Sequence, residues 1–253
     1  LPWANLGVGI VIESRGFFTD GQKAKAHIAA GAKRVVITAP ATGEATTALV
    51  GVNDDRFGNA GPVTANASCT TNSVAPVLQI LLENLGIKKS GMVTVHGYTA
   101  TQKLVDGPDG KDIRRGRAAA ANIVPSTTGA ADAVIQAIPA LEGKFDAVAV
   151  RVPVIAGSLS VITALVEKAT TAGAVNGIFA RAAHDPRWAR ILKVTSDELV
   201  STDIIGEPYG AIIDTSLTKV VDGDLVKIFS WYDNEAGYTA TLVEHVRRIA
   251  AVL

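Results

Sequence analysis

The sequence predicts an α/β region with a partial parallel sheet, followed by an α+β region in which helices cover one face of a mixed or antiparallel sheet. The first observation is the order strand, helix, strand over residues 8–13, 21–30 and 33–40, the βαβ pattern of a parallel sheet. The second is the change after Ser68 to strand candidates that are rich in β-branched residues and alternate more strongly. The composition, with 48% hydrophobic and 19% charged residues, 24 Gly and 10 Pro, fits a globular chain of many short elements.

The first unit of the chain is expected to span residues 1–67. Residues 8–13 form an apolar strand, and residues 21–30 form a helix with Ala24 and Ile28 on one side. Gly31 is a suitable helix stop. Residues 33–40 and 48–53 are predicted to be two further strands of the same sheet.

The only cysteine of the chain, Cys69, lies in the string Ala-Ser-Cys-Thr-Thr-Asn-Ser of residues 67–73. These polar side chains suit a helix cap, and the apolar residues 74–85 follow at helical spacing and end at Gly86. Pro76 is tolerated if it falls in the first turn. The thiol is therefore expected at a helix N-terminus, where the dipole lowers a cysteine pKa. The alternative is a buried, inert cysteine.

The second unit, residues 68–232, is expected to hold most of the strands. Its strand candidates are residues 91–96, 146–152, 158–168, 210–218 and 225–232, and its further helices are residues 129–138 and 176–184. Residues 233–253 form a C-terminal segment whose helix, from residue 236, has an apolar stripe at steps of three and four. That stripe must pack on another element.

A thiolate nucleophile usually needs a base, and His96 is the best candidate among the four histidines. His96 closes a strand and precedes Gly97 and several hydroxyls, which is the usual location of an active site in α/β folds. We expect His27, His184 and His245 to be surface or packing residues.

Charge and targeting signals exclude several classes of protein. Lys plus Arg equals Asp plus Glu at 24 each, so nothing favours nucleic acid or an anionic membrane as a partner. A single cysteine excludes an intramolecular disulfide. No apolar run of 18 residues and no signal peptide is present, and we expect a cytoplasmic protein.

Five ordered strings give the chain a family resemblance. They are residues 67–72 (Ala-Ser-Cys-Thr-Thr-Asn), 96–103 (His-Gly-Tyr-Thr-Ala-Thr-Gln-Lys), 125–131 (Pro-Ser-Thr-Thr-Gly-Ala-Ala), 151–153 (Arg-Val-Pro) and 231–238 (Trp-Tyr-Asp-Asn-Glu-Ala-Gly-Tyr). In order and spacing the chain resembles the phosphorylating glyceraldehyde-3-phosphate dehydrogenases over essentially its whole length. Erythrose-4-phosphate dehydrogenase is an alternative, but the second and third strings fit the triose enzyme better.

The resemblance implies a domain plan and a cofactor. Residues 1–67 would be the second half of a dinucleotide-binding domain, residues 68–232 the catalytic domain, and the C-terminal helix would pack back on the first. No G-x-G-x-x-G string is present, so the chain is expected to lack the first part of that domain and to bind the dinucleotide weakly or not at all. NAD and NADP both remain open. The full-length form is expected to be a homotetramer, and the alternative for this chain is a non-catalytic remnant that binds phosphate or a partner chain.

The resemblance also implies the chemistry. Cys69 would attack the aldehyde of glyceraldehyde 3-phosphate, His96 would act as the base, and inorganic phosphate would open the resulting thioester to give 1,3-bisphosphoglycerate. The implied substrate and phosphate ligands are Ser68, Thr70, Thr99, Arg114, Thr128, Gly129 and Arg151. The implied cofactor contacts are Thr38, Asn234 and Tyr238, and no metal is implied.

Two positions depart from the family pattern. Arg15 stands where the family usually has Thr, and it is either a cation beside the cofactor or a solvent-facing loop residue. Ser73 stands where the family usually has a second cysteine, which leaves the nucleophile in place and removes any oxidative bridge between the two positions.

Overall fold

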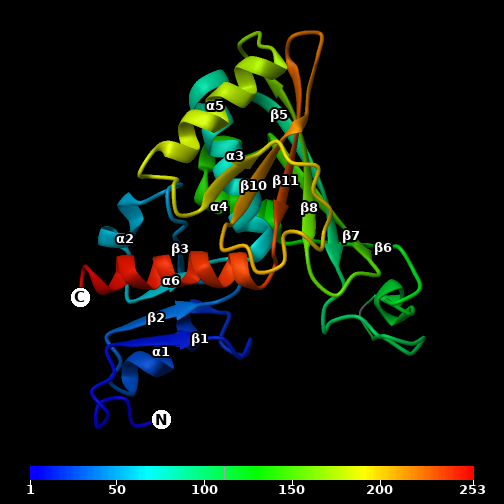
Figure 1. The fold of residues 1–253 in the computed structure, drawn as a ribbon. Helices are drawn as coiled ribbons and strands as arrows, with labels where there is room; N and C mark the ends of the chain where they lie inside the picture. The colour runs from blue at the N-terminus through cyan, green and yellow to red at the C-terminus, as the bar shows by residue number, and fades with distance from the viewer. Residues whose placement is uncertain (111) are drawn as a thin grey trace.

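The computed structural model describes residues 1–110 and 112–253, and its strands form two separate sheets (Figure 1). The first is a parallel sheet with the order β1-β2-β4-β3. Its strands are β1 (Ile10–Glu13), β2 (Arg34–Ile37), β3 (Thr46–Thr47) and β4 (Val63–Ala65). Helix α1 (Gly21–Ala29) connects β1 to β2, and Asp20 caps it by accepting hydrogen bonds from the backbone N–H of Gln22 and Lys23. The predicted βαβ unit and parallel sheet are confirmed.

The prediction of a strand over residues 48–53 is wrong. Strand β3 ends at Thr47, and a buried turn follows before helix α2 (Asp55–Asn59). The Asn53 amide stabilises this turn, because its Oδ1 accepts from the N–H of Leu49 at 2.7 Å and its Nδ2 donates to the carbonyl of Thr47 at 3.1 Å. The apolar residues of the turn are buried in the main core, so their hydrophobicity reflects burial and not extended structure.

The second sheet is mixed, as predicted, and has the order β6-β7-β5-β8-β11-β10-β9. β5 pairs parallel with β7 and β10 with β9, whereas the remaining pairs are antiparallel. Its strands are β5 (Ile87–Gly97), β6 (Val124–Ser126), β7 (Phe145–Val152), β8 (Ser158–Val166), β9 (Leu192–Thr195), β10 (Ala211–Val221) and β11 (Leu225–Tyr232). The short strands β6 and β9 were not predicted, since each has only three or four residues.

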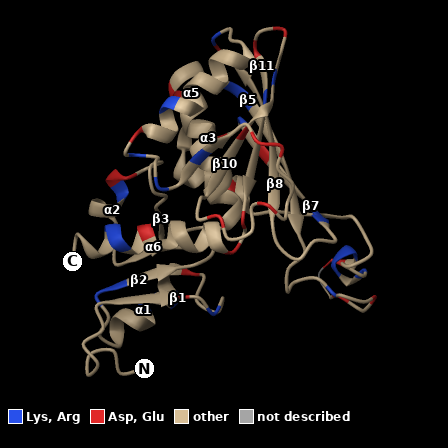
Figure 2. Ribbon diagram, viewed as in Figure 1, with Lys and Arg blue, Asp and Glu red and all other residues tan. Residues whose placement is uncertain are grey.

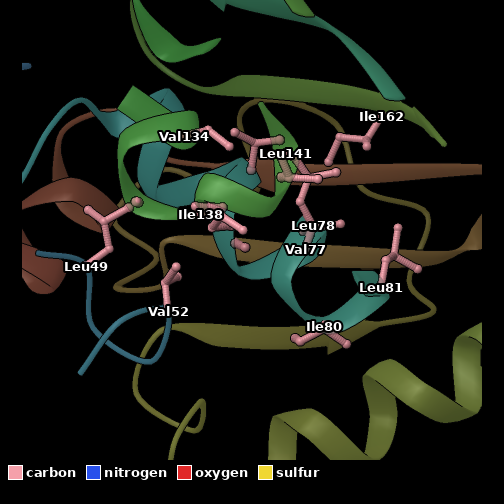
Figure 3. Packing of buried hydrophobic residues seen from close by; sticks show 14 of the residues in the cluster. Leu49, Val52, Val77, Leu78, Ile80, Leu81, Val134, Ile138, Leu141 and Ile162 are labelled. Carbon is pink, nitrogen blue, oxygen red and sulfur yellow. The ribbon is translucent and has the colours of Figure 1, made fainter. Parts of the chain in front are cut away.

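Helix α3 (Cys69–Leu85) lies against this sheet and forms the centre of the core. Figure 3 shows Val77 and Leu78 of α3 gathered with Leu141 beside Ile162 of β8. Gly86 ends the helix with φ +69°, a conformation that suits glycine.

The placement of Pro76 differs from the expectation. Because α3 begins at Cys69, Pro76 lies inside the helix and not in its first turn. A proline there cannot donate to the carbonyl of Asn72, so one internal hydrogen bond of the helix is missing at this point.

The other helices are α4 (Ala130–Ala137), α5 (Ala172–His184) and α6 (Ala236–Ala250), together with short 3₁₀ turns at Ile113–Gly116 and Pro139–Leu141. Helices α3, α4 and α5 cover one face of the mixed sheet (Figure 1). Helix α6 lies against the parallel sheet, where His245 Nε2 and Thr64 Oγ1 of β4 are 2.8 Å apart.

The opposite face of the mixed sheet is open. Val93 of β5 pairs in register with Val148 of β7 and Val161 of β8, and Val93 and Val148 are 40% and 41% exposed. Alternating residues of β8 are buried and partly exposed along its whole length. The open face is therefore apolar at its centre.

The loop between β5 and β6 projects from the body and carries part of the basic residues, while charges of both signs are distributed over the rest of the molecule (Figure 2). In the described part of the chain, no helix is long and apolar enough to span a membrane.

Candidate active site

Cys69 and His96 lie close together where the N-terminus of α3 meets the carboxyl end of β5. Cys69 is the first residue of α3, and His96 lies at the carboxyl end of β5. The Cys69 Sγ atom is 3.6 Å from His96 Nε2. Ser68 fixes the start of the helix, because its Oγ accepts from the N–H of Thr71 at 3.1 Å. The expected helix N-terminus and the expected thiol–imidazole approach are both present.

The thiol does not have the depressed pKa that its position suggests. Burial raises the pKa of Cys69 above its ordinary value, and the hydrogen bonds of Thr70 and the charge of Arg151 offset only part of that rise. The thiol is desolvated although the residue as a whole keeps partial exposure. The physical reason is that loss of water disfavours the thiolate more than the helix terminus and the nearby cation favour it. In this state Cys69 is a thiol at neutral pH.

His96 is neutral at the same pH. Burial, and secondarily the charge of Arg151, lower the pKa of His96 to about 4, and the carbonyl of Gly97 opposes this only in part. A neutral imidazole can accept a proton, which is the property required of a base. Because Cys69 is a thiol and His96 is neutral, the two side chains do not form an ion pair in this state.

Arg151 lies directly beside His96, because the two residues are register partners in the parallel pair β5–β7. Arg151 Nη1 is 2.5 Å from His96 Nδ1 and 3.3 Å from the carbonyl oxygen of Gly97. The same Nδ1 is 2.7 Å from the Gly97 oxygen. The predicted phosphate ligand Arg151 is thus in contact with the predicted base.

The hydroxyl of Thr70, next to the thiol, is held by Tyr232, a residue to which the sequence analysis gave no role. Thr70 Oγ1 is 4.0 Å from Cys69 Sγ and 3.0 Å from the Tyr232 hydroxyl. The ring of Tyr232 also makes an edge-to-face contact with His96, with centroids 5.9 Å apart. The available signal in the sequence was the place of Tyr232 at the end of the predicted strand 225–232.

The remaining candidate phosphate ligands make no hydrogen bond with Cys69, His96 or Arg151 in the described part of the chain. Thr99 follows β5, and its Oγ1 is 3.0 Å from Thr101 Oγ1. Thr128 and Gly129 precede α4, where Thr128 Oγ1 accepts from the N–H of Ala130 at 3.2 Å. A Cβ on Gly129 would meet no atom of the described chain within 4 Å, so the space in front of this backbone is open. Among the described residues, no hydrogen bond connects Thr99, Thr128 or Gly129 to Cys69, His96 or Arg151.

The arginine predicted to bind an anion, Arg114, lies in the basic loop before β6. Arg114 is exposed, and its backbone N–H is bonded to Asp112 Oδ1 at 3.0 Å. Burial lowers the pKa of Arg151, and the charge of the neighbouring Arg115 makes a smaller contribution in the same direction. A role for Arg114 stays a prediction.

The candidate cofactor residues come from three elements. Asn234 Oδ1 accepts from the N–H of Gly157 at 3.1 Å and from Ser158 Oγ at 3.3 Å, which orients the amide. Its Nδ2 donates to no residue of the described chain and is free for a carbonyl acceptor. Tyr238 donates its hydroxyl to the carbonyl of Ala67 at 3.1 Å, two residues before Cys69. An oriented amide with a free N–H donor fits the carboxamide of a nicotinamide.

Thr38 is the third of these residues. It follows β2, and its N–H donates to the carbonyl of Glu13 at 3.1 Å. It therefore lies at the carboxyl edge of the parallel sheet, where ligands of such sheets bind.

Neither departure from the family pattern disturbs the centre. The Arg15 guanidinium lies 5.1 Å from the centroid of the Phe17 ring, and both residues are exposed. Ser73 is buried in α3, with its Oγ 3.3 Å from that of Ser230. Within residues 1–110 and 112–253, no group of three or more His, Cys, Asp or Glu is arranged to hold a metal ion.

Comparison with known proteins gives the family. Residues 68–234 match the model of the family described as "Glyceraldehyde 3-phosphate dehydrogenase, C-terminal domain". A glyceraldehyde-3-phosphate dehydrogenase of Mycobacterium avium is 47% identical over 253 residues, which is 100% of this chain and 74% of the relative. The enzyme of the same name from Thermotoga maritima is 51% identical over 244 residues, 96% of this chain and 73% of the relative. The predicted resemblance is confirmed, and the chain belongs to the glyceraldehyde-3-phosphate dehydrogenase family of oxidoreductases.

Proposed function

We propose that the catalytic residues of this chain serve the NAD- or NADP-dependent oxidation and phosphorylation of glyceraldehyde 3-phosphate to 1,3-bisphosphoglycerate through a thioester on Cys69. The observation that carries the proposal is the 3.6 Å approach of Cys69 Sγ to His96 Nε2, between a helix start and a strand end. A nucleophile within reach of a neutral base is the arrangement that covalent catalysis needs.

The proposed steps follow from the protonation states. The Cys69 thiol loses its proton to His96 Nε2 as Sγ bonds to the aldehyde carbon, and His96 passes that proton to the former carbonyl oxygen, which gives a hemithioacetal and a neutral His96. His96 then removes the hydroxyl proton of that adduct when the carbon is oxidised to a thioester. Attack of inorganic phosphate on the thioester carbon breaks the S–C bond and returns the Cys69 thiolate. Because burial disfavours the free thiolate, its formation is coupled to bond formation at the substrate.

Two sets of residues are proposed to bind the two phosphates of the reaction. Arg151 and Thr99 are proposed to hold the phosphate of the substrate, since a guanidinium fork matches phosphate oxygens. Ser68, Thr70, Thr128 and Gly129, together with Arg114 or Arg115, are proposed to serve the attacking phosphate. The open space in front of Gly129 and the place of the Thr128 hydroxyl at the start of α4 support this assignment.

A nicotinamide cofactor, when bound, supplies the hydride acceptor for the oxidation step. Asn234 is proposed to donate Nδ2–H to the carboxamide of the ring, and Tyr238 to pack beside it. Thr38, at the carboxyl edge of the parallel sheet, is proposed to contact the same end of the cofactor. The proposal leaves the choice between NAD and NADP open.

Self-association is part of the proposal. The open face of the mixed sheet is apolar at its centre, across β5, β7 and β8, and exposed apolar patches of this kind mark protein interfaces. We propose that this face meets a second copy of the chain in a homotetramer.

The function is tested by cofactor reduction with glyceraldehyde 3-phosphate and phosphate. Cys69→Ser should abolish turnover, and His96→Asn should lower kcat by about 10²–10⁴-fold, the usual contribution of a general base. The matched control is His184→Asn, at an exposed position on α5. Unchanged turnover in the Cys69 variant would refute the mechanism, and phosphate binding without turnover or NAD binding would favour the non-catalytic alternative.

A further inference from the structure

The backbone is strained two residues before Cys69. Ala67 has φ +53°, in the left-handed region, which in the described part of the chain is shared by only one other non-glycine residue, Asp222. An alanine in this region is disfavoured by roughly 5- to 30-fold in population, because its Cβ approaches the following carbonyl oxygen. Ala67 is fully buried between β4 and α3, so its surroundings in the fold must hold this conformation.

Side-chain donors hold three successive carbonyl oxygens of this turn. The Asn72 amide nitrogen Nδ2 donates to the carbonyl oxygen of Asn66 at 2.7 Å and to that of Ser68 at 2.9 Å. The Tyr238 hydroxyl donates to the carbonyl oxygen of Ala67 at 3.1 Å. The peptide planes on both sides of Ala67 are therefore oriented by side chains, and the relative orientation of two successive planes is what φ and ψ describe.

The Asn72 amide joins the parallel sheet to the start of α3. Asn72 is 5% exposed, and its backbone N–H donates at 3.0 Å to the same Ser68 oxygen that its amide contacts. The N–H of Asn66 donates to the carbonyl of Ile37 in β2 at 3.0 Å, which anchors the other side of the turn to the sheet. The peptide bond of Ser68 leads directly into Cys69, so the position of the turn is passed to the thiol.

We propose that Asn72 is a positioning residue for Cys69. Its amide keeps Ala67 in the left-handed conformation, and that conformation sets the direction in which the chain enters α3 and hence the place of Cys69 Sγ. Without the amide, Ala67 would relax to a negative φ and the start of α3 would move with it. Rates of reaction at a nucleophile depend steeply on where its reacting atom is held. This inference rests on the proposed role of Cys69 as the nucleophile.

The test is acylation of Cys69 by p-nitrophenyl acetate, an activated ester whose reaction needs neither cofactor nor phosphate. Sγ bonds to the acetyl carbon, the bond from that carbon to the p-nitrophenolate oxygen breaks, and the thiol proton goes to the buffer. The released p-nitrophenolate gives the rate constant, and Cys69→Ser supplies the blank. Asn72→Leu, which keeps a similar shape without the two donors, should lower the rate constant by about 5- to 30-fold, the population that an unsupported alanine loses.

Ala67→Gly distinguishes positioning from a purely structural role. Glycine populates the left-handed region about as readily as the right-handed one, so Asn72→Leu combined with Ala67→Gly should react within about threefold of Ala67→Gly alone. Asn53→Leu is the matched control, because the Asn53 amide is also buried and donates to two carbonyls, those of Thr47 at 3.1 Å and Ala137 at 3.3 Å, in a different turn. It should leave the rate constant unchanged. Denaturant titration shows that each variant is folded under the assay conditions.

Each contrary result has a distinct meaning. If Asn72→Leu fails to fold, Asn72→Ser takes its place, because its smaller side chain leaves room for water at the two carbonyls. Unchanged acylation in the folded Asn72 variant overturns the positioning role. A loss that Ala67→Gly does not reduce, or an equal loss in Asn53→Leu, overturns it as well, since the amide would then not act through Ala67. Acylation of the unaltered chain no faster than that of Cys69→Ser would instead remove Cys69 as the nucleophile of the proposed function, and the positioning role with it.

Discussion

The hydroxyl of Tyr232 lies 3.0 Å from Thr70 Oγ1 and 2.7 Å from Thr94 Oγ1. It thereby joins three elements at the reactive thiol, since Tyr232 ends β11, Thr70 follows Cys69 in α3, and Thr94 lies in β5. All three side chains are buried, so none of these hydroxyls can exchange its partner for bulk water. The thiol and the base are held together by this network as well as by the packing of α3 on the sheet.

Tyr232→Phe should destabilise the protein because it leaves two buried threonine hydroxyls without this partner. The expected loss in unfolding free energy is about 1–3 kcal/mol, the cost of unsatisfied buried polar groups. Tyr209→Phe is the matched control, since the Tyr209 hydroxyl has no hydrogen-bond partner among the described residues. Denaturant titration gives both values, and equal losses in the two variants would show that the network contributes nothing.

Much of the fold follows from the sequence because the decisive signals are local. The cap at Ser68, the apolar spacing of α3 and the alternation in β8 each depend on neighbours along the chain. The failure at residues 48–53 has the opposite cause. This turn is buried by tertiary contacts, so its residues are as apolar as those of a strand. The Asn53 side chain, which holds the turn by hydrogen bonds, is not a strong turn signal by itself.

The site could be predicted as a set of residues but not as a set of protonation states. Cys69, His96 and Arg151 stand in recognisable strings, and the structure brings them together. The raised thiol pKa could not be anticipated, because it depends on how completely the folded chain removes water from Sγ. The contact of Tyr232 with Thr70 also crosses 162 positions of sequence.

Alkylation of Cys69 by iodoacetamide should have a high pH midpoint in the absence of cofactor and substrate. Burial raises the pKa of the thiol, so the thiolate fraction at pH 7 is small and the rate should continue to rise beyond the ordinary cysteine value of about 8.5. The rate is measured from pH 6 to 10 by mass spectrometry, with N-acetylcysteine as the reference thiol. A midpoint below that of the reference would mean that the helix terminus outweighs desolvation.

His245 should make the stability of the fold sensitive to acid. It is fully buried on α6, its Nδ1 has no hydrogen-bond partner among the described residues, and burial lowers its pKa to about 4. The unfolded chain binds the proton near pH 6.5, so stability is complete above that pH and is lost as the pH falls toward 4. The shift corresponds to about 3 kcal/mol.

Replacement of His245 by Gln should remove that part of the pH dependence. Between pH 7 and pH 4, the unfolding free energy of the unaltered chain should fall by about 3 kcal/mol more than that of His245→Gln, as measured by denaturant titration at several pH values. His184→Gln, at the exposed end of α5, is the matched control. An unchanged slope in His245→Gln would assign the acid sensitivity to other groups, of which His96 is the first candidate.

The open sheet face provides a test of self-association. Val93 is central on this face, flanked in register by Val148 and Val161, and remains 40% exposed in the single chain. Val93→Lys would bury a charge at the centre of the proposed contact, where charged residues are disfavoured, while it costs little in a separated chain. The mass measured by sedimentation should therefore fall from that of an oligomer to that of one chain.

Val200→Lys controls for the added charge, because Val200 is 59% exposed and lies outside the sheet. A Val93→Lys protein with the mass of the unaltered oligomer would move the interface elsewhere, and a monomeric unaltered chain would remove the proposal for this chain altogether.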